Sequence, residues 1–340
     1  MSSPCPESSP DTQNSKASLT PLLHLVEDDL KAVNRMIVHR MQSPVSLIPQ
    51  LASHLIASGG KRIRPLITLA STKLCGYEGV HHITLAACVE FIHSATLLHD
   101  DVVDESTMRR GVVSAHEVWG NQESVLVGDF LFSRAFQLMV EVGSLEILSI
   151  LSSASASIAQ GEVLQLLTAQ NLATTQESYL EVVTSKTARL FEAASEIGAV
   201  LAERSAQERE ALANFGRNLG IAFQLVDDAL DYSVREAKFG KNAGDDFREG
   251  KMTLPVVYAL ERASPEEKAF WKRTLGELQQ KEGDFNQAIA YMTRHKTLER
   301  TLENATCYAR EAQTQLRIFS PGPFRMALEA LTSFVIDRTS

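Results

Sequence analysis

The chain has 340 residues, of which 44% are hydrophobic and 22% charged, and its formal net charge is −9. This length and apolar content allow a large buried core. The negative balance argues against a general nucleic-acid-binding protein, which would carry a basic stripe, so no nucleic acid is expected as a partner. The cysteines are scattered and form no CxxC pair, which predicts reduced thiols in a cytoplasmic protein and no zinc or disulfide framework; they are Cys5, Cys75, Cys88 and Cys307.

Residues 1–18 are rich in Ser and Pro and lack the basic start and apolar centre of a signal peptide. This composition predicts a disordered N-terminal lead-in. No apolar run in the chain is expected to be long enough to span a membrane. We therefore expect two parts, the lead-in over 1–18 and one all-helical domain over 19–340.

From residue 19 onward, apolar residues recur at spacings of three and four, and strand signals are nearly absent. Segments 83–103, 124–142 and 219–230 are apolar on nearly all sides, which predicts interior helices. Segments 206–213 and 264–281 predict exposed helices. The expected fold is therefore all-α, a single large helical bundle in which central helices surround a deep apolar cavity and carry the site.

Acidic residues close two of the predicted interior helices with the same spacing. Asp100 and Asp104 lie four residues apart and share one helix face, and Asp101 nearly shares it. The pattern Asp-Asp-x-x-Asp recurs at the end of the helix predicted over 219–230, in Asp227, Asp228 and Asp231. One such motif usually marks a solvated helix end, whereas two copies that each end an apolar helix favour a metal site.

Electrostatics favour the same interpretation. Two like charges 4 Å apart repel by about 1 kcal/mol in water and by about 4 kcal/mol at an effective dielectric near 20. Six carboxylates facing one cavity would therefore be costly without cations, and oxygen ligands without a His or Cys cluster favour Mg²⁺. Because Mg²⁺ is usually held by one or two carboxylates and by phosphate oxygens, we expect an open site that a diphosphate completes.

Basic residues supply candidate phosphate ligands. Lys61 and Arg64 follow a pair of glycines, and Arg109 and Arg110 follow the first acidic motif. Arg can bind a phosphate in bidentate fashion, and Lys supplies a point charge; each residue taken alone could equally lie on a solvated surface. Nucleotide-binding glycine motifs are absent, so diphosphate binding would depend on metal and side chains. Further candidates, each of which could also be an ordinary core or surface residue, are His93, Lys186, Thr187, Gln224, Lys241 and Lys251.

Eight segments together resemble the trans-polyprenyl diphosphate synthases, and the resemblance runs from about residue 19 to near the C-terminus. It is closest to the bacterial long-chain enzymes, the octaprenyl, solanesyl and decaprenyl diphosphate synthases. The segments are GGKRIRP, LLHDDVVDESTMRRG, SVLVGDFLFSRAFQLM, GEVLQL, SKTARLFEAA, FQLVDDALDY, FGKNAGDD and EGKMTLP.

The resemblance implies a fold of the isoprenoid synthase type, a homodimer, and a transferase that adds isopentenyl diphosphate repeatedly to an allylic diphosphate such as farnesyl diphosphate. It implies three Mg²⁺ ions, two on Asp100 and Asp104 with Asp101 in support, and a third on Asp227 with Asp228 and Asp231. The implied ligands of the allylic diphosphate are Arg109, Lys186, Thr187 and Gln224. The implied ligands of isopentenyl diphosphate are Lys61, Arg64, His93 and Arg110, and Lys241 and Lys251 are further substrate-binding candidates.

Product length would depend on how deep the cavity runs. Ala95 and Thr96 precede Asp100 by five and four residues, about 6–8 Å down the helix axis. In the family that the chain resembles, bulky aromatic residues here stop growth early. Since both residues are small, we expect a long-chain product of about C40 to C50, by analogy, for a quinone side chain. Phe132, Phe136 and Met139 could form a deeper floor, although their spacing is also that of ordinary core packing.

Burial is worth about 0.8 kcal/mol per CH₂. A long product should therefore leave slowly, which favours peripheral membrane contact during release. Three alternatives stay open at this point: a terpene cyclase, a shorter-chain geranylgeranyl diphosphate synthase, and a non-enzymatic helical scaffold or regulatory subunit. A cyclase would need no second diphosphate site, and a scaffold would tolerate loss of an acidic motif, yet both motifs are present.

Overall fold

The computed structural model describes residues 18–57, 59–109, 111–233 and 244–337. In these residues the fold is all-α, as predicted, apart from a two-stranded hairpin of β1 (Met108–Arg109) and β2 (Val112–Val113). The predicted lead-in over 1–18 lies almost wholly outside the described residues, as do Arg110 and Lys241.

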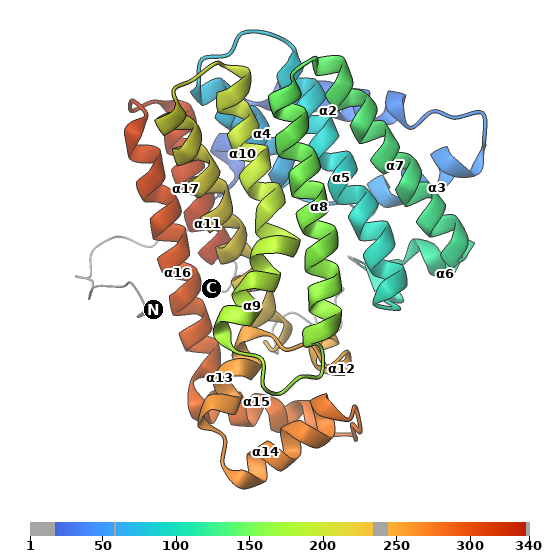
Figure 1. Cartoon of the computed structure of the whole chain (residues 1–340), viewed down its shortest axis with the longest axis vertical. Helices are drawn as coiled ribbons and strands as arrows, with labels where there is room; N and C mark the ends of the chain where they lie inside the picture. The colour runs from blue at the N-terminus through green and yellow to red at the C-terminus, as the bar shows by residue number, and fades with distance from the viewer. Residues whose placement is uncertain (1–17, 58, 110, 234–243, 338–340) are drawn as a thin grey trace.

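Long helices run side by side through the bundle, as Figure 1 shows. Helix α10 contacts α4, α5, α8 and α11, so it occupies the centre. The long helices are α4 (Ile63–Leu74), α5 (His81–Val103), α7 (Asn121–Val142), α8 (Leu145–Thr168), α10 (Arg189–Leu201) and α11 (Ala206–Asp231).

Shorter elements cover this bundle and connect its helices. The N-terminal elements and the small helix before α7 are α1 (Thr20–Leu25), α2 (Glu27–Arg40), α3 (Leu47–Ala57) and α6 (Ala115–Trp119). Helix α9 (Gln176–Val183) leads into α10 through a π-helical turn, η1 (Thr184–Ala188). Helices α16 (Thr297–Gln315) and α17 (Pro323–Asp337) pack on α11, with the 3-10 turn η4 (Leu316–Ile318) between them.

A second, smaller hydrophobic cluster lies at one end of the bundle, at the bottom of Figure 1. Its helices are α12 (Asp245–Arg248), α13 (Leu254–Arg262), α14 (Pro265–Trp271), which continues into the π-helical turn η3 (Lys272–Gly276), and α15 (Asp284–His295). Trp271, Tyr232 and Phe247 are buried there. This cluster holds α12 and the loop after it beside the end of α11.

The sequence pattern placed most helices correctly but divided one of them and extended another too far. Segments 206–213 and 219–230, predicted as separate helices, are parts of the one helix α11, and the helix predicted over 264–281 ends at Trp271 before a π-helical turn. The glycines inside α11 do not end the helix. They lack a Cβ, and this lets α10 and η1 pack closely on α11. A Cβ on Gly216 would lie 2.3 Å from the carbonyl oxygen of Phe191, and one on Gly220 would lie 2.7 Å from Cα of Ala188.

Helix α8 differs from the expectation that no segment could span a membrane. By length and composition alone it could do so, since its most apolar window has a mean hydropathy of 1.3. Among the described helices it is the one that passes this test, and 33% of the window is buried in the chain. Helix α8 therefore has two apolar sides. One packs on α10 and η1 inside the bundle, and the other is exposed on this chain.

The close contact at Gly216 gives a test of the packing between α10 and α11. We expect Gly216→Ala to destabilise the fold by about 1–3 kcal/mol, because the added methyl group meets backbone that cannot move alone. Urea denaturation would measure the change. Gly322→Ala is the matched control, since no atom lies within 4 Å of a Cβ at that position. Equal stability of the two variants would contradict the packing argument.

Candidate active site

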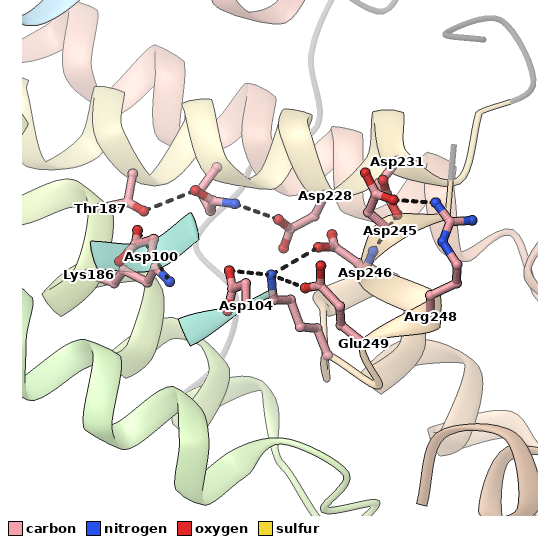
Figure 2. A network of polar contacts seen from close by, with 12 residues as sticks. Asp100, Asp104, Lys186, Thr187, Asp228, Asp231, Asp245, Asp246, Arg248 and Glu249 are labelled. Atoms are coloured by element: carbon pink, nitrogen blue, oxygen red, sulfur yellow. Dashed lines mark hydrogen bonds and ion pairs between the residues drawn. The ribbon is translucent and has the colours of Figure 1, made fainter. Parts of the chain in front are cut away.

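The two acidic motifs face one another across a shared space in Figure 2. Asp100 lies in the last turn of α5, Asp104 is the residue that ends this helix, and Asp231 ends α11. The carboxyl end of a helix carries a partial negative charge. Acidic side chains at two such ends are therefore unfavourable unless cations compensate them, and the structure places lysines there.

Lys186 is one of these cations. Its Nζ lies 2.6 Å from Oε2 of Glu162 and 3.9 Å from Oδ2 of Asp100, and all three side chains are largely buried. Its position depends on the π-helical turn η1 and on Gly161 of α8, where a Cβ would lie 2.6 Å from the backbone nitrogen of Lys186. Such π-helical turns are frequent at functional sites.

Lys251 is the second cation. Its Nζ lies 3.1 Å from Oδ2 of Asp104 and 3.9 Å from Oδ1 of Asp246, and it also pairs with Glu249. These three carboxylates raise the pKa of Lys251 despite its burial. Its contacts place this lysine between the residue that ends α5 and the short helix α12. It therefore links the side of the site that carries the first motif to the side that carries the second.

The second aspartate of each motif has a different environment from its neighbours. Asp101 is buried and pairs with the Nε of Arg109. Asp228 is buried and accepts hydrogen bonds from the Tyr179 hydroxyl at 2.5 Å and from Nε2 of Gln224 at 2.7 Å. Burial raises the pKa of both carboxyl groups, that of Asp228 to about 7. Protein donors thus engage both buried carboxylates.

The remaining aspartates of the second motif lie at the end of α11. Asp227 is partly buried. Oδ2 of Asp231 accepts the backbone N–H of Asp246 at 3.1 Å, so it ties the end of α11 to the first turn of α12. Gln224, one turn earlier, accepts a hydrogen bond from Thr187 at 3.0 Å through Oε1. Thr187, Gln224 and Asp228 line one pocket together with Lys186 and Lys251.

A second polar cluster joins residues predicted to bind isopentenyl diphosphate. Nη1 of Arg64, on α4, lies 3.0 Å from Nε2 of His93, on α5, and the guanidinium stacks 4.5 Å from the centroid of the Phe191 ring. Lys61 is exposed and lies 4.7 Å over the Phe334 ring of α17. The structure therefore brings Arg64 and His93 together and places Lys61 at the surface near them in sequence.

Among the described residues, no three or more His, Cys, Asp or Glu side chains gather in an arrangement that could hold a metal ion by themselves. The carboxylates of the two motifs are nonetheless the hard oxygen ligands that Mg²⁺ prefers. Mg²⁺ also keeps several ligand positions for water and phosphate oxygens. The residues therefore fit a metal that a bound diphosphate completes, and they do not fit a closed protein cage.

Sequence reasoning missed several residues of this network, among them Glu162, Tyr179, Asp246 and Glu249. Burial, reinforced by Asp100, raises the pKa of Glu162 to about 7, although Lys186 opposes that shift. Its signal in the sequence was a single acidic residue in the otherwise apolar second half of α8. Tyr179 gave no signal, because nothing in the sequence relates it to Asp228, 49 positions away.

The residues predicted to set product length have different environments. Ala95 is fully buried on α5, Met139 is buried on α7, and Thr96 is partly buried and bonds the carbonyl of His93. The suggestion that Phe136 forms part of an interior floor is wrong for this chain, since its side chain is 39% exposed. The apolar stripe of α7 has an inner edge at Met139 and an outer edge at Phe136, which spacing alone could not separate.

Comparison with known proteins is consistent with this geometry. Residues 45–292 match the polyprenyl synthetase family. Octaprenyl diphosphate synthase of Escherichia coli is 44% identical over 321 residues, covering 94% of this chain and 99% of that protein. The crystal structure of a polyprenyl synthase from Caulobacter crescentus, complexed with calcium and isoprenyl diphosphate, superimposes with a TM-score of 0.93 at 52% identity, covering 96% of this chain and 100% of that one.

A decaprenyl diphosphate synthase from Rhodobacter capsulatus superimposes with a TM-score of 0.91 at 49% identity and covers 95% of this chain and 100% of its own. The chain therefore belongs to the polyprenyl synthetase family and has its all-α isoprenoid synthase fold. Its enzymatic class is that of a prenyltransferase.

Because the carboxylates do not form a closed metal cage, Mg²⁺ and a diphosphate should bind cooperatively. We expect Mg²⁺ with inorganic pyrophosphate to raise the melting temperature by more than the sum of the shifts that each causes alone, measured by differential scanning fluorimetry. Asp100→Asn should abolish this excess. Asp245→Asn should retain it, because Asp245 pairs with Arg248 on the exposed side of α12. A full shift with Mg²⁺ alone would contradict the open-site interpretation.

Proposed function

We propose that the protein condenses isopentenyl diphosphate successively onto an allylic diphosphate, such as farnesyl diphosphate, to make a long-chain all-trans polyprenyl diphosphate. The observation that carries this proposal is the meeting of two acidic helix ends across one space, beside a pocket lined by the half-buried Lys186 and Lys251, in a chain of the polyprenyl synthetase family. The names of the relatives support the long-chain product, since they include octaprenyl and decaprenyl diphosphate synthases.

In this proposal, the allylic diphosphate lies between the ends of α5 and α11. Asp100, Asp104 and Asp227 would hold Mg²⁺, which when bound neutralises the charge that develops on the departing diphosphate. The proposed number is three ions, and the calcium and isoprenyl diphosphate in the Caulobacter crescentus structure support a divalent metal. Lys186 and Lys251 are held by carboxylates on both sides, so they are already in place when the C–O bond breaks.

Isopentenyl diphosphate would bind at the second polar cluster. Arg64 donates to Nε2 of His93 there, and the Phe191 ring beneath the guanidinium holds it in place. Lys61 and Arg110 are proposed to complete this set. The double bond of isopentenyl diphosphate would then attack the allylic cation, and the released diphosphate would take the proton. The buried apolar residues of α5, Ala95 and Leu98, keep water from the cation.

Two observations favour this activity over its alternatives. A terpene cyclase acts on one diphosphate, and a second cationic cluster at Arg64 and His93 would have no role in it. A geranylgeranyl diphosphate synthase would need an early block, whereas Ala95 and Thr96 are small. A product of about C40 to C50 is the range that the family resemblance favours. Its use for a quinone side chain is part of the same proposal.

We further propose that the protein is a cytoplasmic homodimer in which the exposed sides of α7 and α8 meet a second copy. Apolar side chains gather on this face, and they include Phe136, Val140, Leu145, Val163, Leu166 and Leu167. Helix α8 lies at the front of Figure 1, with its neighbour α7 beside it. A second subunit would cover this surface, which explains the apolar outer side of α8 without a membrane span. Contact with lipid would then be peripheral, during release of the product.

The activity is tested directly with isopentenyl diphosphate, farnesyl diphosphate and Mg²⁺, with mass spectrometry of the product. We expect consumption of isopentenyl diphosphate and a product of about C40 to C50, and Asp100→Ala should lower turnover at least about 100-fold, because the metal site loses a ligand. Consumption of the allylic substrate alone would support a cyclase instead. Undiminished turnover in Asp100→Ala would contradict the proposed metal site.

Ala95→Phe tests the depth of the cavity. The aromatic ring would lie about 7 Å below the metal-binding end of α5. We therefore expect it to shorten the product to about three or four isoprene units, with isopentenyl diphosphate still consumed. Val38→Phe, on the exposed side of α2, is the control and should leave the product unchanged. An identical ladder of products on chromatography for both variants would reject this role.

Leu166→Glu and Leu167→Glu test the subunit contact. Their side chains are 60% and 72% exposed, so the substitutions should spare the fold of one subunit while placing charges in the proposed apolar contact. We expect sedimentation or light scattering to show monomers. Met326→Glu, at a side chain 66% exposed on α17, should stay dimeric. Dimers with unchanged affinity in all three variants would show that the two copies meet elsewhere.

A further inference from the structure

A chain of hydrogen bonds connects α9, η1 and α11 beneath the pocket. The hydroxyl of Tyr179 donates to Oδ2 of Asp228 at 2.5 Å, Nε2 of Gln224 donates to Oδ1 of Asp228 at 2.7 Å, and the hydroxyl of Thr187 donates to Oε1 of Gln224 at 3.0 Å. Asp228 is 3% exposed and Tyr179 is 5% exposed, so solvent does not reach the Tyr179 end of this series of hydrogen bonds.

The direction of each bond fixes the Gln224 amide. A carboxylate only accepts, so Asp228 must face the NH₂ group of Gln224, and the amide oxygen then faces the hydroxyl of Thr187. If the amide turned over, its oxygen would meet the Asp228 carboxylate and the hydrogen bond to Asp228 would be lost. The amide has a second N–H, for which the described residues offer no acceptor. Gln224 lines the pocket, so this donor is available to an anion there.

Both oxygens of Asp228 accept hydrogen bonds from protein groups, which favours an orienting role over metal ligation. Tyr179 donates to one oxygen and Gln224 to the other, so the buried carboxylate is held by two side chains before any ligand binds. Tyr179 reaches the pocket lining as well, but the acceptor of its proton is Asp228. The role of Tyr179 would therefore be to hold Asp228, and the role of Asp228 to orient Gln224.

We propose that Tyr179 is a positioning residue which, through Asp228, holds Gln224 as a hydrogen-bond donor to the diphosphate of the allylic substrate, and that Asp228 orients Gln224 and does not ligate metal. The inference rests on the proposed function, since it takes the anion in this pocket to be the allylic diphosphate. It adds a residue to the site that the acidic motifs alone do not indicate. It also gives Asp228 a role in orienting Gln224, whereas its neighbour Asp227 is the proposed metal ligand.

The first experiment compares Tyr179→Phe with Tyr258→Phe. Tyr258 is also buried, and its hydroxyl bonds Gln176 and Asn304, outside the pocket lining. We expect Tyr179→Phe to raise KM for the allylic diphosphate about five- to tenfold, the effect of one weakened hydrogen bond, with kcat and KM for isopentenyl diphosphate within about twofold. Calorimetry with an unreactive allylic thiodiphosphate should show the same loss of affinity. Tyr258→Phe should change neither.

The second experiment asks whether Tyr179 acts through Gln224. In a Gln224→Met background the amide is absent, so Tyr179→Phe should have no further effect on the affinity for the thiodiphosphate. An undiminished effect in that background would overturn the inference, because it would show a purely structural role. Asp228→Asn, which can accept only one of the two hydrogen bonds, should weaken affinity similarly and leave the Mg²⁺ concentration for half-maximal activity unchanged.

Asp227→Asn is the matched control for the metal, and it should raise that Mg²⁺ concentration. An equal rise in Asp228→Asn would show that Asp228 is a metal ligand and would overturn the inference. The two levels of proposal fail differently. A wild-type protein that does not consume isopentenyl diphosphate refutes the proposed function, whereas an active wild type with unaltered affinity in Tyr179→Phe refutes only the role of Tyr179.

Discussion

The site depends on negative charge gathered at the carboxyl ends of two helices. Asp100 and Asp104 end α5, and the second motif ends α11, so acidic side chains add to the negative ends of two helix dipoles. Lys186 and Lys251 compensate part of this charge, each between carboxylates of different elements. A diphosphate that enters brings further negative charge, so it can bind only together with cations. The same repulsion that destabilises the empty pocket therefore makes metal and substrate binding cooperative.

Helix geometry gives the aspartates of each motif different surroundings. In Asp-Asp-x-x-Asp the first and last residues lie four apart on one face, while the second is turned by about 100° from the first. In both helices that second residue points into protein and is buried, where Asp101 meets Arg109 and Asp228 meets Tyr179 and Gln224. The repeated spacing thus combines two carboxylates on one helix face with one that anchors the helix end to its neighbours.

The sequence sufficed for most helices and for the two motifs, because these follow from local periodicity. The family resemblance grouped Arg64 with His93 as ligands of one substrate, although it did not predict their hydrogen bond. The sequence did not suffice for contacts between distant segments. Glu162 beside Lys186 depends on Gly161, which lets α8 approach η1, and no local pattern encodes that approach. Phe136 was misplaced because a stripe on α7 does not reveal which of its edges faces inward. Helix α11 was divided because a glycine in a sequence signals a break and, in a packed interface, permits contact instead.

Helix α8 carries residues of the site and residues of the proposed subunit contact. Its inner side carries Gly161 and Glu162, which set the position of Lys186, and its outer side carries Val163, Leu166 and Leu167 one to five residues further on. Residues 161 to 167 span about two turns of the helix, so the two sets lie close together along α8. A subunit packed on the outer side would hold α8 against η1 and thereby hold Glu162 against Lys186. In the proposed dimer, the contact between subunits and the electrostatic balance of the site would therefore depend on the same short stretch of one helix.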